Sequence, residues 1–389
     1  MHQALITPDA GILFILAGNA SLWFFLEKQY RWKLFNFVPP LLFIYLLPAV
    51  FSNTGLIPNE SGVYDWMGAN ILPAFLVLLL LDVDVKATIK VMGRGIFVML
   101  IGTLGVVIGA PIAYFVVKGW LAPDAWTGYG ALAGSWIGGT GNMAAVAEGI
   151  ETSGTNFGLA VIADNVVYLV WLPILLNSKR LAKAFNKFTG VSDESVMKMK
   201  EAAGEMAVDK GEPQMRHYLY LIAIGLGATW FAGLLAGMLP VIPPVFSTNT
   251  YKILIVTTMG LALSFSPAKN IPGSHKLAMA LVYLFVSRMG AETNVAGLAG
   301  QAIPFVAGAY IWIFIHGAFI LLAAKLFKID IHTAAIASAA NIGGAASAPI
   351  VASFHDERLV PVSILMALIG YAIGNYAAFG AAYLLSVVA

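Results

Sequence analysis

Long apolar runs recur along the whole chain and limit what it can fold into. Each is about 15 to 25 residues long, the length with which an α-helix crosses about 30 Å of hydrocarbon. Only 11% of the 389 residues are charged and 59% are apolar, whereas a soluble globular domain carries about 25% charged residues. The first run, Gly11 to Leu26, has no Lys or Arg before it and no small-residue cleavage site after it, which favours a retained helix over a signal peptide. The sequence therefore predicts an all-α, polytopic membrane protein.

Two of the apolar segments are interrupted by glycines. Hydropathy predicts twelve segments, near residues 10–26, 35–51, 67–81, 95–117, 126–150, 156–176, 217–239, 251–265, 277–290, 301–324, 331–353 and 359–387. The fifth contains GGTGN at 138–142, and the eleventh contains NIGG at 341–344 followed by Pro349. Glycine and proline at these positions break a helix in the middle of the membrane.

Basic residues indicate how these two segments run, because Lys and Arg gather in cytoplasmic loops. The loop 177–216 holds eight of them, whereas 51–66 and 240–250 hold none. If all twelve segments crossed the membrane, this basic loop would lie outside. If the two interrupted segments enter from opposite faces and return, the basic loops lie inside. We therefore predict ten spans and two re-entrant segments in a bacterial inner membrane, with both termini extracytoplasmic and 177–216 cytoplasmic.

This topology gives two halves of opposite orientation, each with five spans and one broken or re-entrant helix. The predicted units are a first inverted repeat at 1–176, a cytoplasmic linker at 177–216 and a second repeat at 217–389. Placing Gly138 on Gly343 aligns GGTGNMAAVA with GGAASAPIVA. Inverted repeats with interrupted helices are typical of secondary transporters. Within the linker, residues 192–208 are predicted to form an amphipathic surface helix.

Helix breaks inside a bilayer imply a cavity, because free backbone groups are tolerated there only beside protein or water. Half-helix N-termini near Asn142 and Ala345 suit a carboxylate or another polar substrate group. The alternative is that the glycines only allow close helix packing. The predicted substrate-binding residues are Gly139, Thr140, Gly141, Asn142, Asn341, Gly343, Gly344 and Ser347.

Asp164 lies in the middle of the predicted span 156–176, where an ionisable group is costly and indicates function by default. A carboxylate near broken-helix carbonyls suits Na⁺ or a proton; the alternative is a structural hydrogen bond to a neighbouring helix. The predicted ion-coupling residues are Asp164, Asn165, Asn142, Glu292 and Asn375, and the predicted Na⁺ ligands are Asp164, Asn142 and Thr140.

For Glu292, Glu148 and His316, a structural role is an alternative to a role in transport. Glu292 is four residues after Arg288 and is expected to pair with it along the helix. Glu148 is expected on the returning arm of the first broken segment, where contact with solvent and a functional role are both open. His316, inside the tenth segment, is expected to be a packed and hydrogen-bonded histidine, although a proton relay would also use such a residue.

The sequence argues against several classes of function. It contains no cysteine and no H-E-x-x-H, and no second carboxylate clearly pairs with Asp164, so we predict no enzyme. We likewise predict no cofactor besides a coupling ion. A net charge of +2 gives no reason to expect nucleic acid. The expected partners are a small-molecule substrate and the lipid bilayer, with a homodimer left open.

Several motifs together resemble a known family. They are Phe37-Val-Pro-Pro40, the stretches 52–58, 72–73 and 81–84, GGTGN, Asp164-Asn165 and NIGG. The chain resembles the eight-nineteen domain-of-unknown-function membrane family, within the superfamily of bile-acid:sodium symporters and cation/proton antiporters. The resemblance implies an elevator mechanism, in which a mobile core domain slides past a panel domain, with Na⁺ or H⁺ bound near crossed broken helices. It places Thr140, Asn142 and Asp164 at that site, while the second half departs in lacking an obvious second carboxylate.

The predicted function is secondary active transport of a small, carboxylate-bearing organic solute, such as an amino acid, a peptide or an organic anion. Coupling would be to Na⁺ or H⁺, through elevator-type alternating access. The alternative is a cation/proton antiporter without an organic substrate. The polar residues around the breaks favour the larger site that an organic solute needs. A purely structural or receptor role does not explain two matched helix breaks.

Overall fold

The structure is a computed structural model that describes residues 4–30, 35, 40–83, 93–192 and 211–389. All regular elements in these ranges are helices, which confirms the predicted all-α class. Nearly all of the helix predicted at 192–208 lies outside the described residues, as do 193–210 of the linker and parts of the motifs at 37–40 and 81–84.

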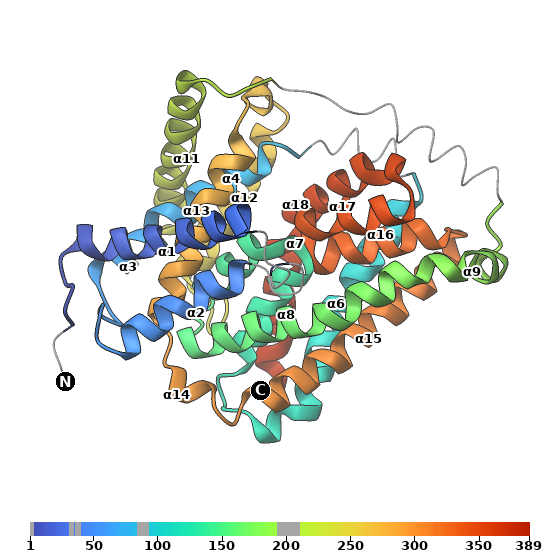
Figure 1. The fold of residues 1–389 in the computed structure, drawn as a ribbon, viewed down its shortest axis with the longest axis horizontal. Coiled ribbons are helices and arrows are strands. Elements are labelled where there is room, and N and C mark those ends of the chain that lie inside the picture. The colour runs from blue at the N-terminus through green and yellow to red at the C-terminus, as the bar shows by residue number, and fades with distance from the viewer. Residues whose placement is uncertain (1–3, 31–34, 36–39, 84–92, 193–210) are drawn as a thin grey trace.

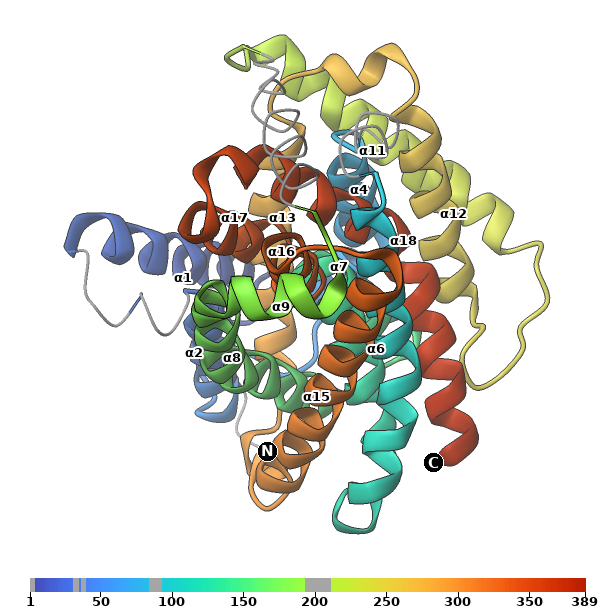
Figure 2. The same cartoon turned by 90° about the vertical axis from the view of Figure 1, so that its right-hand side faces the viewer.

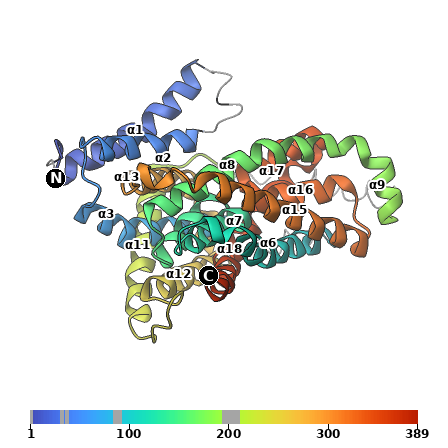
Figure 3. The same cartoon turned by 90° about the horizontal axis from the view of Figure 1, so that it is seen from below.

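The helices form two packed groups, which lie left and right in Figure 1. The left one, the α13 group, contains α1 (Asp9–Tyr30), α2 (Pro40–Asn53), α3 (Gly62–Trp66), α4 (Leu72–Leu80), α11 (Met215–Ala236), α12 (Thr248–Leu263) and α13 (Ser274–Ala291). The right one, the α7 group, contains α6 (Gly95–Val117), α7 (Trp126–Gly149), α8 (Gly154–Asn177), α9 (Ala182–Thr189), α15 (Ala302–Phe327), α16 (Ile331–Ile342), α17 (Gly344–His355) and α18 (Val360–Val388). The short α14 (Val295–Leu298) connects them. The same division is visible from below (Figure 3).

The fifth predicted segment is a helical hairpin, hairpin 1 (126–149). The chain reverses at Gly139, whose φ of 74° and ψ of −174° interrupt α7. A Cβ atom on Gly134 would lie 2.7 Å from the carbonyl oxygen of Asn142, so the two arms run side by side. Near the open end, the Thr152 hydroxyl donates to the Thr127 carbonyl over 3.3 Å.

The eleventh segment, hairpin 2 (331–355), reverses at Gly344, where φ is 57°. Its arms are α16 and α17, which lie next to each other beside α7 in Figure 2. Nδ1 of His332, at the start of α16, is 2.9 Å from Nδ1 of His355, at the end of α17. Both interrupted segments thus have the hairpin geometry that the charge pattern predicts.

The hairpins enter the α7 group from opposite faces, and α8 connects these faces. At the start of α8, the Asn156 amide donates to the Asp124 carbonyl at the base of hairpin 1 over 3.0 Å. At its end, the Leu175 carbonyl is 3.0 Å from Nε2 of His355 at the base of hairpin 2. The 24 residues of α8 span about 36 Å. We name the two sides the hairpin-1 face and the hairpin-2 face.

The hairpin tips meet between these faces. A Cβ atom on Gly344 would lie 3.6 Å from the Cα atom of Gly139, so the two tips are within van der Waals contact of each other. The first described residues and the end of α18 lie on the hairpin-1 face. The Ile6 amide donates to the Leu56 carbonyl over 2.9 Å just beyond α2, and Lys118 donates to the Val388 carbonyl over 2.6 Å.

Seven helices are long and apolar enough to cross a membrane: Asp9–Tyr30, Gly62–Leu80, Gly95–Trp120, Gly154–Thr189, Met215–Ala236, Ala302–Phe327 and Glu357–Val388. This count refers to the part of the chain that the structure describes. The other three predicted spans correspond to α2, α12 and α13, which are 14, 16 and 18 residues long. The polytopic membrane class is thus confirmed, with fewer full-length spans than the ten predicted.

Candidate functional site

A cavity of about 340 Å³ lies where the two hairpin tips meet. Both helix groups contribute to its wall. The α7 group supplies the hairpin tips, the middle of α8 and part of α18, and the α13 group supplies residues at the ends of α2 and α4 and the first half of α13. The lining residues include Leu41, Leu79, Ser135, Gly139, Thr140, Gly141, Asp164, Asn165, Tyr168, His275, Met279, Tyr283, Gly343, Gly344, Ala345, Ala346, Ser347 and Tyr371.

The tip of hairpin 2 gives the cavity one polar wall. The helix α17 begins at Gly344 and runs for 12 residues, and its first residues, Gly344, Ala345 and Ala346, line the cavity. The first N–H groups of a helix have no carbonyl partner within that helix, and the helix dipole makes this end positive. The side chain of Ser347 also lines the cavity.

The Asp164 carboxylate gives the cavity wall a negative group, opposite in sign to the start of α17. One oxygen of its carboxylate accepts from the Ser135 hydroxyl over 3.0 Å, and the other accepts from Trp136 Nε1 over 2.9 Å. Both donors belong to the entering arm of hairpin 1. A carboxylate has about four acceptor positions, so these two bonds leave capacity for a ligand. Among the described lining residues there is no other Asp or Glu and no Lys or Arg.

Most predicted site residues come together at this cavity. Its lining includes Gly139, Thr140, Gly141, Asp164, Asn165, Gly343, Gly344 and Ser347. The structural alternative for Asp164, a hydrogen bond to a neighbouring helix, is also present, because Ser135 and Trp136 bind the same carboxylate.

Three predicted amides do not line the cavity and instead bind neighbouring helices. The amide of Asn142 donates to the Tyr371 carbonyl over 3.2 Å. The amide of Asn341 donates to the Thr103 hydroxyl over 2.8 Å, and that of Asn375 to the Thr257 hydroxyl over 2.8 Å. The first two bonds lie inside the α7 group, whereas the third joins α18 to α12.

The cavity fits the predicted Na⁺ ligands only in part. Thr140 and Asp164 line it together, whereas Asn142 does not. Na⁺ would be held by hard oxygen ligands, and the lining provides these from Thr140, Asp164 and Ser347. Among the described residues, no three His, Asp or Glu side chains gather as a metal site.

Sequence reasoning missed the wall that the α13 group provides. His275, Met279 and Tyr283 follow one another at helical spacing along α13 and line the cavity. The His275 ring stacks near Tyr371, with ring centroids 6.4 Å apart. The spacing of 275, 279 and 283 indicates one helix face, but no residue of this set breaks the apolar pattern enough to indicate a site.

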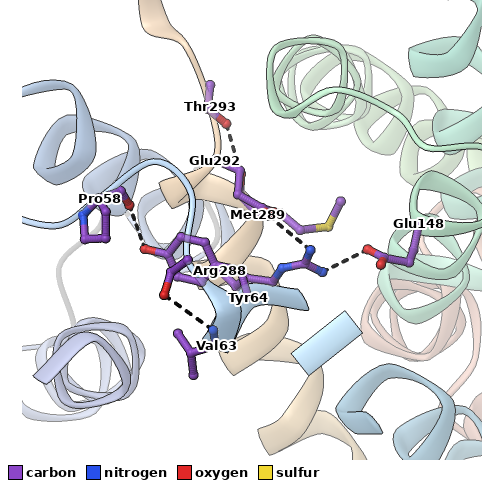
Figure 4. Close-up of polar contacts among 9 residues, drawn as sticks. Pro58, Val63, Tyr64, Glu148, Arg288, Met289, Glu292 and Thr293 are labelled. Atoms are coloured by element: carbon purple, nitrogen blue, oxygen red, sulfur yellow. Dashed lines mark hydrogen bonds and ion pairs between the residues drawn. The ribbon is translucent and has the colours of Figure 1, made fainter. Parts of the chain in front are cut away.

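A second polar cluster lies between the two helix groups on the hairpin-1 face (Figure 4). The Arg288 guanidinium donates to Glu148 over 2.8 Å and to Glu292 over 3.0 Å, and Arg288 is only 5% exposed. The Arg288–Glu292 pair is thus confirmed. Glu148, for which the sequence leaves solvation open, belongs to the same cluster, with 22% of its side chain exposed. A polar cavity of about 430 Å³ lies beside it, lined also by Glu60 and Glu151.

His316 is confirmed as a packed histidine. It is fully buried, with Nδ1 2.9 Å from the Gly102 carbonyl oxygen and Nε2 3.0 Å from the Ser338 hydroxyl. Both ring nitrogens are therefore engaged by neighbouring helices, away from the central cavity.

The reversal at Gly139 leads to a stability prediction. Because its φ of 74° and ψ of −174° lie in a region that only glycine occupies readily, Gly139→Ala is expected to cost about 1–3 kcal/mol. The matched control is Gly380→Ala, since Gly380 has ordinary φ and no atom within 4 Å of an added Cβ. Unfolding in mixed micelles measures both. Equal stability of the two variants would contradict the strained turn.

Two comparisons with known proteins cover nearly the whole chain. A family model described as "Protein of unknown function (DUF819)" matches residues 12–388. The chain is also 28% identical over 391 residues to a Bacillus subtilis (strain 168) protein named "Uncharacterized membrane protein YjcL", with 97% of each chain covered. The similarity therefore includes both hairpins and both helix groups.

Proposed function

We propose that this chain, which belongs to the DUF819 family of membrane proteins, is a secondary active transporter of a small organic solute. The membership confirms the predicted family, and the wider superfamily stays a prediction. The proposal depends on one observation: a cavity with one carboxylate and the start of a helix in its wall lies between two helix groups, where two helical hairpins from opposite faces meet. Transporters bind substrate at such places, near the midplane and beside the ends of broken helices.

The order of the helices supports a mechanism of alternating access. Each half of the chain first supplies helices to the α13 group, and then a helix, a hairpin and a helix to the α7 group. We interpret these halves as inverted repeats, with the α13 group as the panel and the α7 group as the mobile core of an elevator. The alignment of Gly138 with Gly343 also pairs Gly139 with Gly344, the two glycines at which the hairpins turn.

The basic residues support an orientation in the membrane. Lys179, Lys325 and Lys328 lie at the ends of α8 and α15 on the hairpin-2 face. Since Lys and Arg favour the cytoplasmic side, we place the hairpin-2 face in the cytoplasm. Both termini would then be extracytoplasmic, as the sequence predicts, in a bacterial inner membrane.

The cavity favours a substrate with both an amine and a carboxylate. Asp164 is the single carboxylate of the described lining, without Lys or Arg to offset it, so a purely anionic solute would face a like charge. An ammonium group would form a charge-assisted hydrogen bond with Asp164. A carboxylate would bind the first N–H groups of α17 and the Ser347 hydroxyl. An amino acid or a small peptide carries both groups.

The coupling ion would be Na⁺ or H⁺, with Asp164 as the residue that links ion and substrate. A cation/proton antiporter without an organic substrate is the second candidate, because a single membrane carboxylate can serve that function. The cavity volume of about 340 Å³ favours the organic solute, since a bare cation needs far less space.

Uptake into proteoliposomes tests the proposal. We expect zwitterionic amino acids or small peptides to accumulate under an imposed Na⁺ or H⁺ gradient, and organic dicarboxylates to accumulate far less. Protein-free liposomes under the same gradients are the control. Cation/proton exchange without solute uptake would support the antiporter instead. If no solute and no ion moved under any gradient, the transport proposal would be wrong.

A further inference from the structure

We infer that Glu148, Arg288 and Glu292 form a latch that holds the two helix groups together on the hairpin-1 face and must open during transport. This inference rests on the alternating-access part of the proposed function. It assigns a role to a cluster that lies outside the central cavity and that the substrate does not need to touch.

The three residues come from both helix groups. Glu148 belongs to the returning arm of hairpin 1, and Arg288 belongs to α13, which packs against α2 and α4. The Arg288–Glu148 ion pair of 2.8 Å therefore joins the two groups. Glu292 follows one turn after Arg288, so the second ion pair, of 3.0 Å, lies within the α13 group. Figure 4 shows Arg288 between the two carboxylates.

Other hydrogen bonds between the groups surround the latch. The Tyr45 hydroxyl donates to the Gly154 carbonyl over 2.8 Å, and the Thr293 hydroxyl donates to the same oxygen over 3.1 Å. The Thr250 hydroxyl donates to the Gly149 carbonyl over 2.8 Å. All three hydrogen bonds are accepted by the segment 148–155, where hairpin 1 ends and α8 begins. Hydrogen bonds therefore join the two groups along this segment.

The central cavity lies at the hairpin tips and extends from them toward the hairpin-2 face. Its α13 wall starts at His275, and Arg288 is 13 residues further along the same helix, about 20 Å away along its axis. The remaining wall of the α13 group comes from Leu41 at the start of α2 and Leu79 at the end of α4. These positions lie toward the hairpin-2 face. The groups are thus fastened on one face while the cavity extends toward the other, which is the arrangement of one of two alternating-access states.

The latch can open because Arg288 and Glu148 each keep a polar environment after they separate. Removing one partner from a buried ion pair leaves an uncompensated charge, which is strongly destabilising. When Glu148 moves away with the α7 group, however, Arg288 keeps its bond to Glu292 within the α13 group. On the other side, the polar cavity next to Glu148 gives its carboxylate access to water, and the Glu148 side chain is 22% exposed. Both charges therefore have partners in the released state.

Cysteine accessibility tests the latch, and the chain has no cysteine of its own. Ala147→Cys reports on the hairpin-1 face, because Ala147 is fully buried and lines the polar cavity. Met279→Cys reports on the wall of the central cavity. Each reporter is combined with Glu148→Gln, which weakens the bond between the groups. The matched control is Glu292→Gln, which weakens the bond within the α13 group.

With Glu148→Gln we expect a soluble maleimide to modify the Ala147→Cys reporter about tenfold faster or more, because a weaker hydrogen bond replaces the ion pair between the groups. The modification rate of the Met279→Cys reporter should fall. Glu292→Gln should change both rates by less than about twofold, since the bond between the groups stays. Elution of each variant as a single species in size-exclusion chromatography establishes that it is folded.

Unchanged rates with Glu148→Gln, or equal changes with both variants, would overturn the latch. Uptake assays on the same variants separate this result from the proposed function. If the rates change as expected but no solute or ion is transported, the latch stands and the transport proposal fails. If transport is observed without the change in rates, only the latch fails.

Discussion

Asp164→Asn is expected to reduce gradient-driven uptake by about 10- to 100-fold, because a hydrogen bond to a charged group contributes about 1.5–3 kcal/mol. The substrate ammonium would lose its only carboxylate partner among the described lining residues. Uptake of the best substrate into proteoliposomes, over a range of concentrations, measures the loss.

The fold should tolerate this change. Asparagine has the same shape as aspartate, and its carbonyl oxygen can accept from Trp136 while its NH₂ group donates to the Ser135 hydroxyl, which serves as donor or acceptor. Ser135→Ala is the matched control, since it removes one hydrogen bond of 3.0 Å and keeps the charge. We expect it to retain most of the uptake. Normal gradient-driven uptake by Asp164→Asn would remove this residue from the mechanism.

Arg288→Met is expected to have the largest effect on stability. The substitution leaves Glu148 and Glu292 close together without their common cation, in a site where Arg288 is only 5% exposed. Removing one partner from a buried ion cluster costs about 3–5 kcal/mol. The free energy of unfolding in mixed micelles measures this cost.

Two further variants establish that charge, and not side-chain packing, causes the loss. Arg358→Met removes an exposed arginine paired with Asp356 over 2.8 Å, with 56% of its side chain exposed, and should cost about 0–1 kcal/mol. The triple change Arg288→Met, Glu148→Gln and Glu292→Gln removes all charges of the cluster and should recover most of the stability. A triple variant as unstable as Arg288→Met would mean that packing of the arginine is responsible.

The sequence predicts the helices well because a helix that crosses the bilayer needs a continuous run of about 20 apolar residues. The segment 95–117 has the same bounds as α6, and the predicted 126–150 corresponds to α7 (Trp126–Gly149). The glycine-rich stretches predict where the two helices are interrupted. The distribution of Lys and Arg predicts that each interrupted segment returns to the face from which it entered. Asp164 is identifiable for a related reason, since a lone carboxylate among apolar residues contrasts with everything around it.

The partners of polar side chains are not predictable in the same way. Asn142, Asn341 and Asn375 look alike in the sequence, yet each binds a neighbouring helix instead of lining the cavity. Helical periodicity gives the face of a residue and not the helix that it meets. The bond between Glu148 and Arg288 joins positions 140 residues apart, so it depends on how the two helix groups pack.

The position of the two chain ends has a practical consequence. The first described residues, bonded to Leu56, and the end of α18, bonded to Lys118, lie on the same face. A hairpin returns to the face from which it came and adds no net crossing, so the proposed topology has an even number of membrane crossings. Reporter enzymes fused to either terminus should therefore read the same compartment, and a reporter inserted after Ser192 should read the opposite one.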